Sequence, residues 1–207
     1  YMVAAAMTKG DITIENVKFT TTSDYISGYG IFLIFNNPEI HFKNCIFENC
    51  TDSDSNADPS IFHIYKENTY PDNVLFDNCK FINCNMNKNI NIEYCKLVNV
   101  SNCIFEKNTI KSSEIVSKAD IYLKNNQFDS VNPIIIENNG KIVSEVSFNV
   151  LTKSLTVGET GSIVAELVDD NDNRIYSANL KFIVNNVGQN PKFNQTTGLY
   201  TFEITPS

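Results

Sequence analysis

The chain has 207 residues, of which 42 % are hydrophobic and 11 % aromatic, so it is long enough for one or two domains with real cores. Its formal net charge is −8, whereas nucleic-acid binding needs a basic stripe, so we exclude nucleic acid as a partner. No stretch reaches the roughly 18 consecutive apolar residues that a membrane span requires, and we expect none.

The chain opens with an apolar segment, residues 1–7, that is too short for a signal-peptide core and has no basic lead. It precedes Asp11 much as residues 114–118 precede Asp120. We interpret it as the last strand of a structural repeat that begins before residue 1. We therefore expect the chain to be a piece of a longer protein.

A nine-residue unit then recurs, with starts at residues 11, 39, 73, 97 and 120 and therefore steps of 28, 34, 24 and 23 residues. Apolar residues stand at places two and four, Asn at place six and Phe at place nine. A strand-rich period of this size is typical of a solenoid. The asparagines at place six are Asn16, Asn44, Asn78, Asn102 and Asn125, and the phenylalanines are Phe19, Phe47, Phe81, Phe105 and Phe128.

The parity inside the unit predicts a strand, a tight bend and a second strand. Places two and four share one strand face, as do seven and nine, but the step from four to seven breaks the alternation. The bend must therefore lie at places five and six. Asn tolerates the left-handed backbone region that such a corner needs. We expect the Asn and Phe side chains to stack in ladders, one above the next.

A third strand is predicted between successive units, at residues 30–35, 60–65, 89–94, 113–117 and 133–137. Three strands per turn with an Asn corner between two of them indicate a right-handed parallel β-helix of about five rungs. We assign it residues 1–142.

Three of the repeats, Asn44–Cys50, Asn78–Cys84 and Asn102–Asn108, carry the pattern N-C-x-F-x-x-[NC]. This pattern resembles the repeats of polymorphic outer-membrane proteins of the chlamydial type, and more closely those of the adhesin-like surface proteins of methanogenic archaea. The resemblance covers about two thirds of the chain. It implies a β-helix at an extracellular cell surface, without catalysis and without a cofactor.

Two polar loops, residues 51–59 and 66–72, flank the third strand of the 34-residue repeat. The first has oxygen-bearing side chains at alternate positions, as in a calcium loop, although the Gly and Glu of such loops are absent. It is either a weak calcium site or a solvated acidic loop. The residues in question are Asp52, Asp54, Asn56 and Asp58.

The third strands near this excursion are apolar on both faces, and both faces cannot point inward. One set of alternate residues is therefore either an exposed binding strip or covered by the excursion. The members of this predicted strip are Phe32, Ile34, Phe62 and Ile64.

The cysteines also follow the repeat, since Cys45, Cys79 and Cys103 share place seven and Cys50 and Cys84 share the position three after Phe. They form buried ladders of free thiols, or one or two disulfides between neighbouring repeats, or a zinc site. The Cys-x4-Cys spacing does not distinguish these readings.

After residue 140 the Asn-corner unit stops and strands with antiparallel alternation are predicted at residues 143–148, 161–168, 179–184 and 198–204. Leu155–Thr160, Asp169–Asn173 and Thr197–Tyr200 are similar to a bacterial-type immunoglobulin-like repeat. We assign residues 143–207 to an Ig-like β-sandwich, either abbreviated or truncated, because a full sandwich needs about 100 residues.

Enzyme chemistry on a β-helix needs carboxylates that converge on one outer strand face. The outward place five instead alternates in sign, and His41 and His63 lack a nucleophile and a carboxylate at a recognisable spacing. Asn49, Asn99 and Asn194 begin N-glycosylation sequons, which in so Asn-rich a chain are weak signals.

These patterns predict a non-catalytic adhesin or stalk at the cell surface, whose partner is a protein or glycan of a host or neighbouring cell. The alternatives are a polysaccharide lyase or glycoside hydrolase built on a β-helix, and a sugar-binding module without catalysis.

Overall fold

The computed structural model is built from β-strands, and the residues it describes contain no helix. Those residues are 11–21, 32–33, 39–51, 60–64, 70–131, 133–137, 140–184 and 186–206. The predicted all-β class is therefore confirmed.

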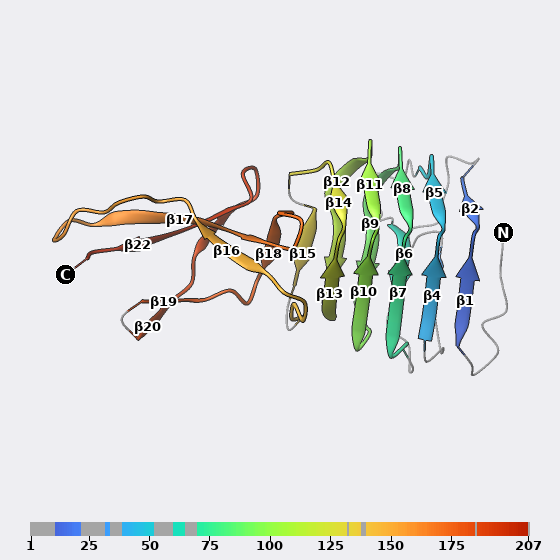
Figure 1. Ribbon diagram of the computed structural model, residues 1–207, viewed down its shortest axis with the longest axis horizontal. Coiled ribbons are helices and arrows are strands. Elements are labelled where there is room, and N and C mark those ends of the chain that lie inside the picture. Colours follow the sequence, from blue (N-terminus) through green and yellow to red (C-terminus); the bar gives the residue numbers. More distant parts are fainter. Residues whose placement is uncertain are drawn as a thin grey trace.

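The strands described between residues 11 and 136, together with a later strand, form a stack of three parallel sheets that the chain visits in turn (Figure 1). Sheet A contains, in spatial order, β1 (Ile12–Glu15), β4 (Glu39–Lys43), β7 (Asn73–Asp77), β10 (Leu97–Ser101) and β13 (Asp120–Lys124). Sheet B contains β2 (Lys18–Phe19), β5 (Ile46–Glu48), β8 (Lys80–Ile82), β11 (Ile104–Glu106) and β14 (Gln127–Phe128). Sheet C contains β3 (Phe32–Leu33), β6 (Ser60–Ile64), β9 (Asn85–Ile92), β12 (Thr109–Ser117), β15 (Ile134–Ile136) and β18 (Ile175–Ser177).

Equivalent residues of successive repeats are direct neighbours in the sheets. Phe47 pairs with Phe81, and Phe42 pairs with Phe76, each at the same place of its unit. Because side chains alternate between the two faces of a strand, this register keeps each apolar place on one face throughout. The stacked parallel sheets predicted from the repeat are therefore present, an arrangement compatible with a β-helix.

The corner between sheets A and B has an asparagine at every repeat. All five place-six asparagines have a positive φ, between 51° and 58°. Their backbone N–H groups donate to the following repeat, as from Asn44 to the carbonyl of Asp77 at 3.0 Å. The side chains add a ladder, since Nδ2 of Asn78 donates to Oδ1 of Asn44 at 2.7 Å.

A second corner, which the sequence analysis did not identify, follows sheet B. Asn49, Asn83 and Lys107 occupy it, with φ of 55°, 53° and 57°. In the two shorter repeats the chain enters sheet C directly from this corner, so β9 and β12 begin earlier than the predicted third strands. The fourth repeat has Lys107 where the second and third have Asn, and this variation hides the corner in the sequence.

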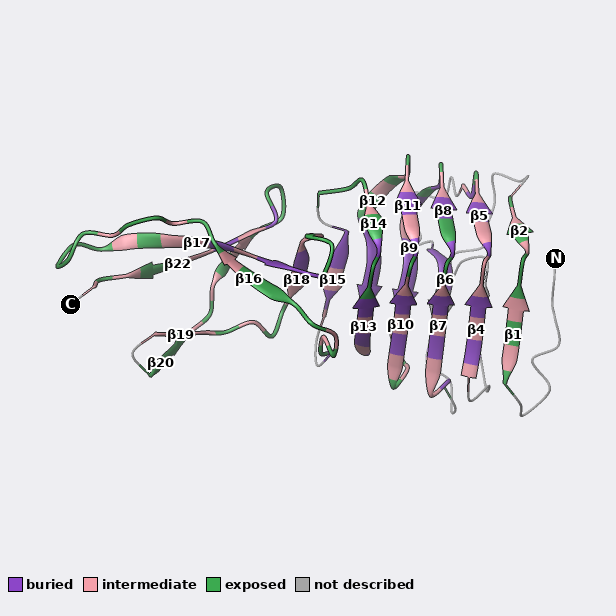
Figure 2. Cartoon of the chain, in the orientation of Figure 1, coloured by how far each residue is buried: buried purple, intermediate pink, exposed green. Residues whose placement is uncertain are grey.

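The core of the stack is apolar and strongly aromatic. Five phenylalanine rings are stacked along it with centroid separations of 5.0, 4.9, 4.5 and 4.5 Å, in the order Phe19, Phe47, Phe81, Phe105 and Phe128. Burying each ring contributes about 1.5–3 kcal/mol. Figure 2 shows that buried residues concentrate on the strands of this stack, whereas β16 and β20 are largely exposed.

The remaining strands are antiparallel and extend from the end of the stack opposite β1 (Figure 1). Sheet D has the order β16 (Ser147–Val150), β17 (Gly161–Val168), β22 (Leu199–Ile204) and β21 (Lys192–Asn194). A separate hairpin joins β19 (Phe182–Val184) to β20 (Val187–Gln189). The strands predicted at residues 161–168 and 198–204 are present as β17 and β22. Those predicted at 143–148 and 179–184 coincide only in part with β16 and β19, and β18, β20 and β21 were not predicted.

The two parts share one sheet. Although β18 lies within residues 143–207, it pairs in parallel with β15 and forms the last strand of sheet C. Sheet A is likewise prolonged by a parallel bridge between Ile121 and Ile142. Sheet C therefore ends on a strand that the following part of the chain supplies, whereas sheet A ends on the bridge to Ile142.

The loop Asp169–Asn173 covers the final corner of the stack. The Asp170 carboxylate accepts the backbone N–H of Asn125 at 2.9 and 3.0 Å, in place of the carbonyl that a further repeat would offer. Asn171 continues the amide ladder, since its Nδ2 lies 3.4 Å from Oδ1 of Asn125 and 2.9 Å from the carbonyl of Asn126. This loop thus caps the stack.

Candidate binding groove

Several residues predicted to form sites lie outside the described part of the chain. These are the calcium-loop residues Asp52, Asp54, Asn56 and Asp58, together with Ile34 and the side chains of Phe32, His63 and Ile64. Phe62 is described, and it is fully buried, with its ring 4.6 Å from that of Phe42. The structure therefore removes Phe62 from the predicted exposed strip and places it in the core of the stack.

All six cysteines are free, and five of them are buried. Sγ of Cys79 donates to the carbonyl of Phe42 at 3.3 Å, one repeat away, and Sγ of Cys103 donates likewise to Phe76. Burial raises the pKa of the Cys103 thiol, which keeps it in the donating form. Within the described ranges, no three His, Cys, Asp or Glu side chains gather as metal ligands would.

The three glycosylation candidates occupy different settings. Asn49 is an exposed corner residue whose Oδ1 accepts from Asn83 at 2.6 Å. Asn99 is half-buried in sheet A and accepts a hydrogen bond from Ser101. Asn194 is exposed, and its Oδ1 accepts the backbone N–H groups of Thr196 and Thr197.

The outer face of sheet A carries paired charges at place five. Lys43 lies 3.4 Å from Glu15 in the preceding repeat, and Asp77 accepts from Asn102 in the following one. His41, also on this face, has a buried Nε2 without a hydrogen-bond partner among the described residues. The Lys43–Glu15 pair and the Asn102–Asp77 hydrogen bond connect neighbouring repeats.

Glu114 is a buried carboxyl group in the stack, next to a β-bulge at which β12 has one more residue than β9. It accepts from Nδ2 of Asn89 at 2.5 Å and from Nδ2 of Asn108 at 3.3 and 3.4 Å. Burial outweighs these hydrogen bonds and raises the pKa of the carboxyl to about 7. Glu114 is therefore partly protonated at neutral pH.

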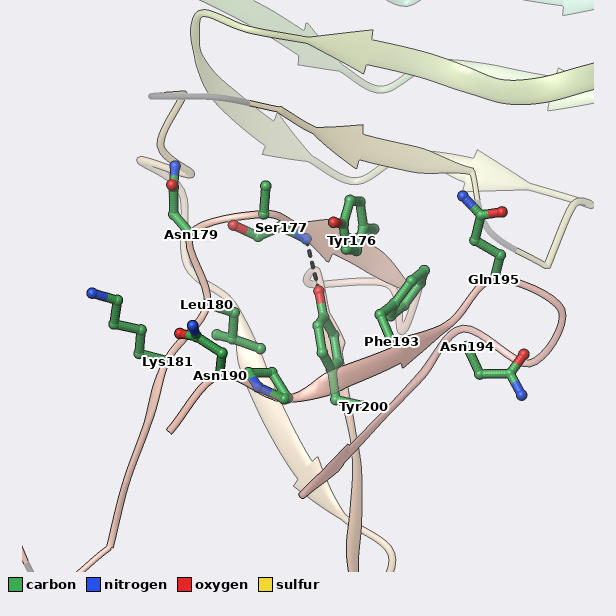
Figure 3. Close-up of a pocket in the computed structure, with 12 residues that line it drawn as sticks. Tyr176, Ser177, Asn179, Leu180, Lys181, Asn190, Phe193, Asn194, Gln195 and Tyr200 are labelled. Carbon is green, nitrogen blue, oxygen red and sulfur yellow. Dashed lines mark hydrogen bonds between the residues drawn. The ribbon is translucent and has the colours of Figure 1, made fainter. Parts of the chain in front are cut away.

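An open groove of about 1130 Å³ lies where the antiparallel part meets the end of sheet C. Its walls are β18, the segment that follows it, and the residues that lead into and form β21, with Tyr200 of β22 beneath (Figure 3). The strands β18, β21 and β22 thus build one surface.

Aromatic rings form one end of this groove. The ring of Phe193 lies 4.4 Å from that of Tyr176 and 4.9 Å from that of Tyr200. Tyr200 is buried, whereas Tyr176 and Phe193 are only half-buried and present ring surface to the groove. Figure 3 shows both rings toward the same end as Gln195, with Lys181 at the opposite end.

Tyr200 holds the groove together. Its Oη accepts the backbone N–H of Ser177 at 2.7 Å and donates to the carbonyl of Ile175 at 3.1 Å (Figure 3). Burial raises the pKa of the phenol well above its ordinary range, so the hydroxyl stays protonated and able to donate. These two bonds fix β22 against β18.

The polar lining is made of amides and one cation. Asn179, Asn190, Asn194 and Gln195 line the groove together with Lys181, and no Asp or Glu is among its lining residues. Asn179 is positioned by a bond from its Nδ2 to the carbonyl of Gly140 at 3.2 Å. Exposed amides beside half-buried rings suit a ligand that has both hydroxyl groups and apolar surface.

Sequence reasoning missed this groove. Two of its walls are β18 and β21, which were not predicted as strands, and none of its residues belongs to the nine-residue repeat. One signal was available, because residues 185–195 combine four asparagines and two glutamines with Phe193. Such a segment has more amide groups than a simple turn requires.

Comparison with known proteins found no match, either to a protein-family model or among curated proteins and solved structures. In the described part of the chain, no helix has the length and apolar character to cross a membrane.

Proposed function

We propose that this chain is a non-catalytic adhesive protein of a cell surface, acting outside the cell. It attaches to a protein or glycan of a host or neighbouring cell. The proposal includes a finer architecture than stacked sheets, namely a right-handed parallel β-helix of about five rungs over residues 1–142. An Ig-like β-sandwich over residues 143–207 follows it.

The observation that supports this function is how the repeats are tied to one another. Each strand of the stack bonds to the equivalent strand of the next repeat, and charged groups on the outer face of sheet A pair along the stack, as Lys43 does with Glu15 at 3.4 Å. Such a stack forms a stiff rod with broad outer faces. This form suits holding a binding surface away from a cell.

Two further features support the proposal. The pattern of repeats resembles that of adhesin-like surface proteins. In addition, an open groove lies beside the antiparallel part, at the end of the stack away from β1. A rod that ends beside a groove is arranged to present that groove to a partner.

The test is an attachment assay run beside a turnover assay. Beads coated with the folded chain are exposed to cells and to glycan-coated surfaces under flow, with heat-unfolded chain as the control. The same preparation is incubated with acidic and neutral polysaccharides, and oligosaccharide products are measured. We expect saturable attachment without products. Product release that follows enzyme concentration would instead establish a carbohydrate-active enzyme.

A further inference from the structure

The groove continues beyond its aromatic end. A second hollow of about 340 Å³ lies beside it, lined by Lys111, Ser112 and Ile135 of the stack and by Thr196. Phe193 and Gln195 line both hollows. The two hollows therefore adjoin at these two side chains. Together they form one elongated groove, which suits a chain-like ligand.

The chemistry of the lining fits sugar rings. A pyranose ring has an apolar face that packs on an aromatic ring, and Tyr176 and Phe193 present half-buried rings here. Its hydroxyl groups both donate and accept hydrogen bonds, as do the side-chain amides of Asn190 and Gln195.

The charge of the site is opposite to that of the protein. The chain has a formal net charge of −8, yet the two hollows are lined by Lys181 and Lys111 and by no Asp or Glu. Both lysines are exposed, and neither has an ion-pair partner among the described residues. The net negative charge of the chain disfavours nucleic acid. At the two hollows, however, the unpaired ammonium groups of Lys111 and Lys181 favour a ligand that carries acidic groups.

We propose that this elongated groove binds an acidic oligosaccharide, a chain of sugars that carry carboxylate or sulfate groups. The sugar rings pack against Tyr176 and Phe193, and Lys111 and Lys181 pair with acidic groups at the two ends. This inference rests on the proposed adhesive function and names the ligand class and the site.

The experiment measures binding of the purified chain to three immobilised glycans of matched length: a polyuronate, a sulfated glycan and a neutral glucan. The variants are Lys111→Gln, Lys181→Gln and their combination, which alter exposed side chains and leave the fold intact. Lys153→Gln, an exposed lysine outside both hollows, is the matched control. Circular dichroism verifies that each variant is folded.

We expect binding to one or both acidic glycans and none to the neutral glucan. Each lysine substitution should weaken binding about two- to fivefold, and the double substitution about fourfold to twenty-fivefold, the range for exposed ion pairs. Added salt should weaken wild-type binding and reduce the difference between wild type and double variant. The polyuronate and sulfated arms show which acidic group is preferred.

Phe193→Tyr and Phe193→Ala test the ring contact. The first keeps a packing ring and should retain binding, whereas the second should weaken it about tenfold or more. Equal binding to the neutral glucan, or binding unchanged by the double lysine substitution, overturns the inference. So does absence of binding to all three glycans while beads still attach to cells, a result that leaves the adhesive function standing. Loss of attachment to every surface would refute that function itself.

Discussion

The corner asparagines combine two roles that other residues fulfil only singly. At φ between 51° and 58° an L-residue with a Cβ is strained, and Gly would relieve this strain but contribute no side chain. Asn tolerates the conformation, and its amide also bonds the neighbouring repeat, as from Asn78 to Asn44 at 2.7 Å. The repeat therefore keeps Asn at this place in all five units.

We predict that Asn78→Ala lowers the free energy of unfolding by about 1–3 kcal/mol, because it adds left-handed strain and removes the amide bond. Asn78→Gly loses the amide bond but not the backbone conformation, so it should cost about 1 kcal/mol less. Urea denaturation measures both. Asn85→Ala, an exposed asparagine outside the corners, is the control and should change little. Equal losses for Ala and Gly at position 78 would contradict the role of strain.

Glu114 destabilises the fold when it is ionised. Its pKa is raised from 4.5 to about 7, so the folded state binds the proton more tightly than the unfolded state does. The stabilising effect of that proton is complete below pH 4.5 and is lost as pH rises through 7. Oδ1 of the neighbouring Asn89 is buried without a hydrogen-bond partner among the described residues, whereas its Nδ2 faces the Glu114 carboxyl. A 180° rotation of the Asn89 amide exchanges these two atoms, so that a protonated Glu114 can donate to Oδ1.

We predict that Glu114→Gln, which cannot ionise, is nearly neutral for stability at pH 5. At pH 9 it should stabilise the protein by up to about 3 kcal/mol, the free-energy equivalent of the shift. Thermal unfolding of both proteins from pH 5 to 9 gives the difference. Glu159→Gln, at an exposed position, should show no such pH dependence. A difference that stays constant with pH would show that Glu114 is not the group responsible.

At the scale of elements, a thiol and an amide both donate a hydrogen bond to a backbone carbonyl of the preceding repeat, at the start of sheet B. Sγ of Cys103 donates to the carbonyl of Phe76, and in the next repeat Nδ2 of Asn126 donates to the carbonyl of Val100 at 2.8 Å. Asn126 also accepts the backbone N–H of Cys103 at 3.0 Å. A small buried donor therefore occupies this place in the second to fifth repeats, supplied by Cys or Asn, whereas the first repeat has Val17.

The joint between β22 and β18 depends on one hydroxyl group. Tyr200→Phe leaves the buried N–H of Ser177 and the carbonyl of Ile175 without their partner, so we predict a loss of about 1–3 kcal/mol in the free energy of unfolding. Chemical denaturation is the measurement.

Tyr176→Phe is the matched control for this joint, since it removes a hydroxyl from the same ring cluster without breaking those two bonds. It should change stability by less than about 0.5 kcal/mol. A similar loss in both variants would mean that ring packing and not the hydroxyl holds β22 in place.

At the scale of the whole molecule, the stack and the antiparallel part complete each other. The stack ends on β18 and on the loop Asp169–Asn173, both of which belong to the later part of the chain. Without β18 the last edge of sheet C would be open to pairing with other chains, and without the loop the backbone N–H of Asn125 would lose its acceptor. The groove exists only where these two parts meet.

We therefore predict that both parts unfold in a single transition. The chain contains no Trp, so Phe19→Trp in the first repeat and Phe202→Trp in sheet D provide one local probe each. Their fluorescence midpoints in urea should coincide with each other and with the far-ultraviolet circular dichroism of the unmodified chain. Two separated midpoints would show that the shared strand β18 does not couple the parts.

Much of the stack could be predicted from the sequence, because its rules are local. The alternation of side chains and the recurrence of Asn16 and its equivalents place sheets A and B within a residue or two. The second corner was missed because Lys107 breaks the series of Asn49 and Asn83. The groove was missed because its rings, Tyr176, Phe193 and Tyr200, meet only after three separate strands have been positioned.

By itself the amino-acid sequence determined the all-β class, the parallel stacking and the Asn corners, since these follow from side-chain alternation and backbone preference within nine residues. The tertiary structure alone decided that β18 completes sheet C, that Asp170 caps the last corner, and that three aromatic rings gather at one groove. The first two features join residues far apart in the chain, 45 positions in the case of Asn125 and Asp170, and no short-range pattern encodes such pairings. They form because an unpaired buried strand edge is costly and the nearest suitable strand satisfies it.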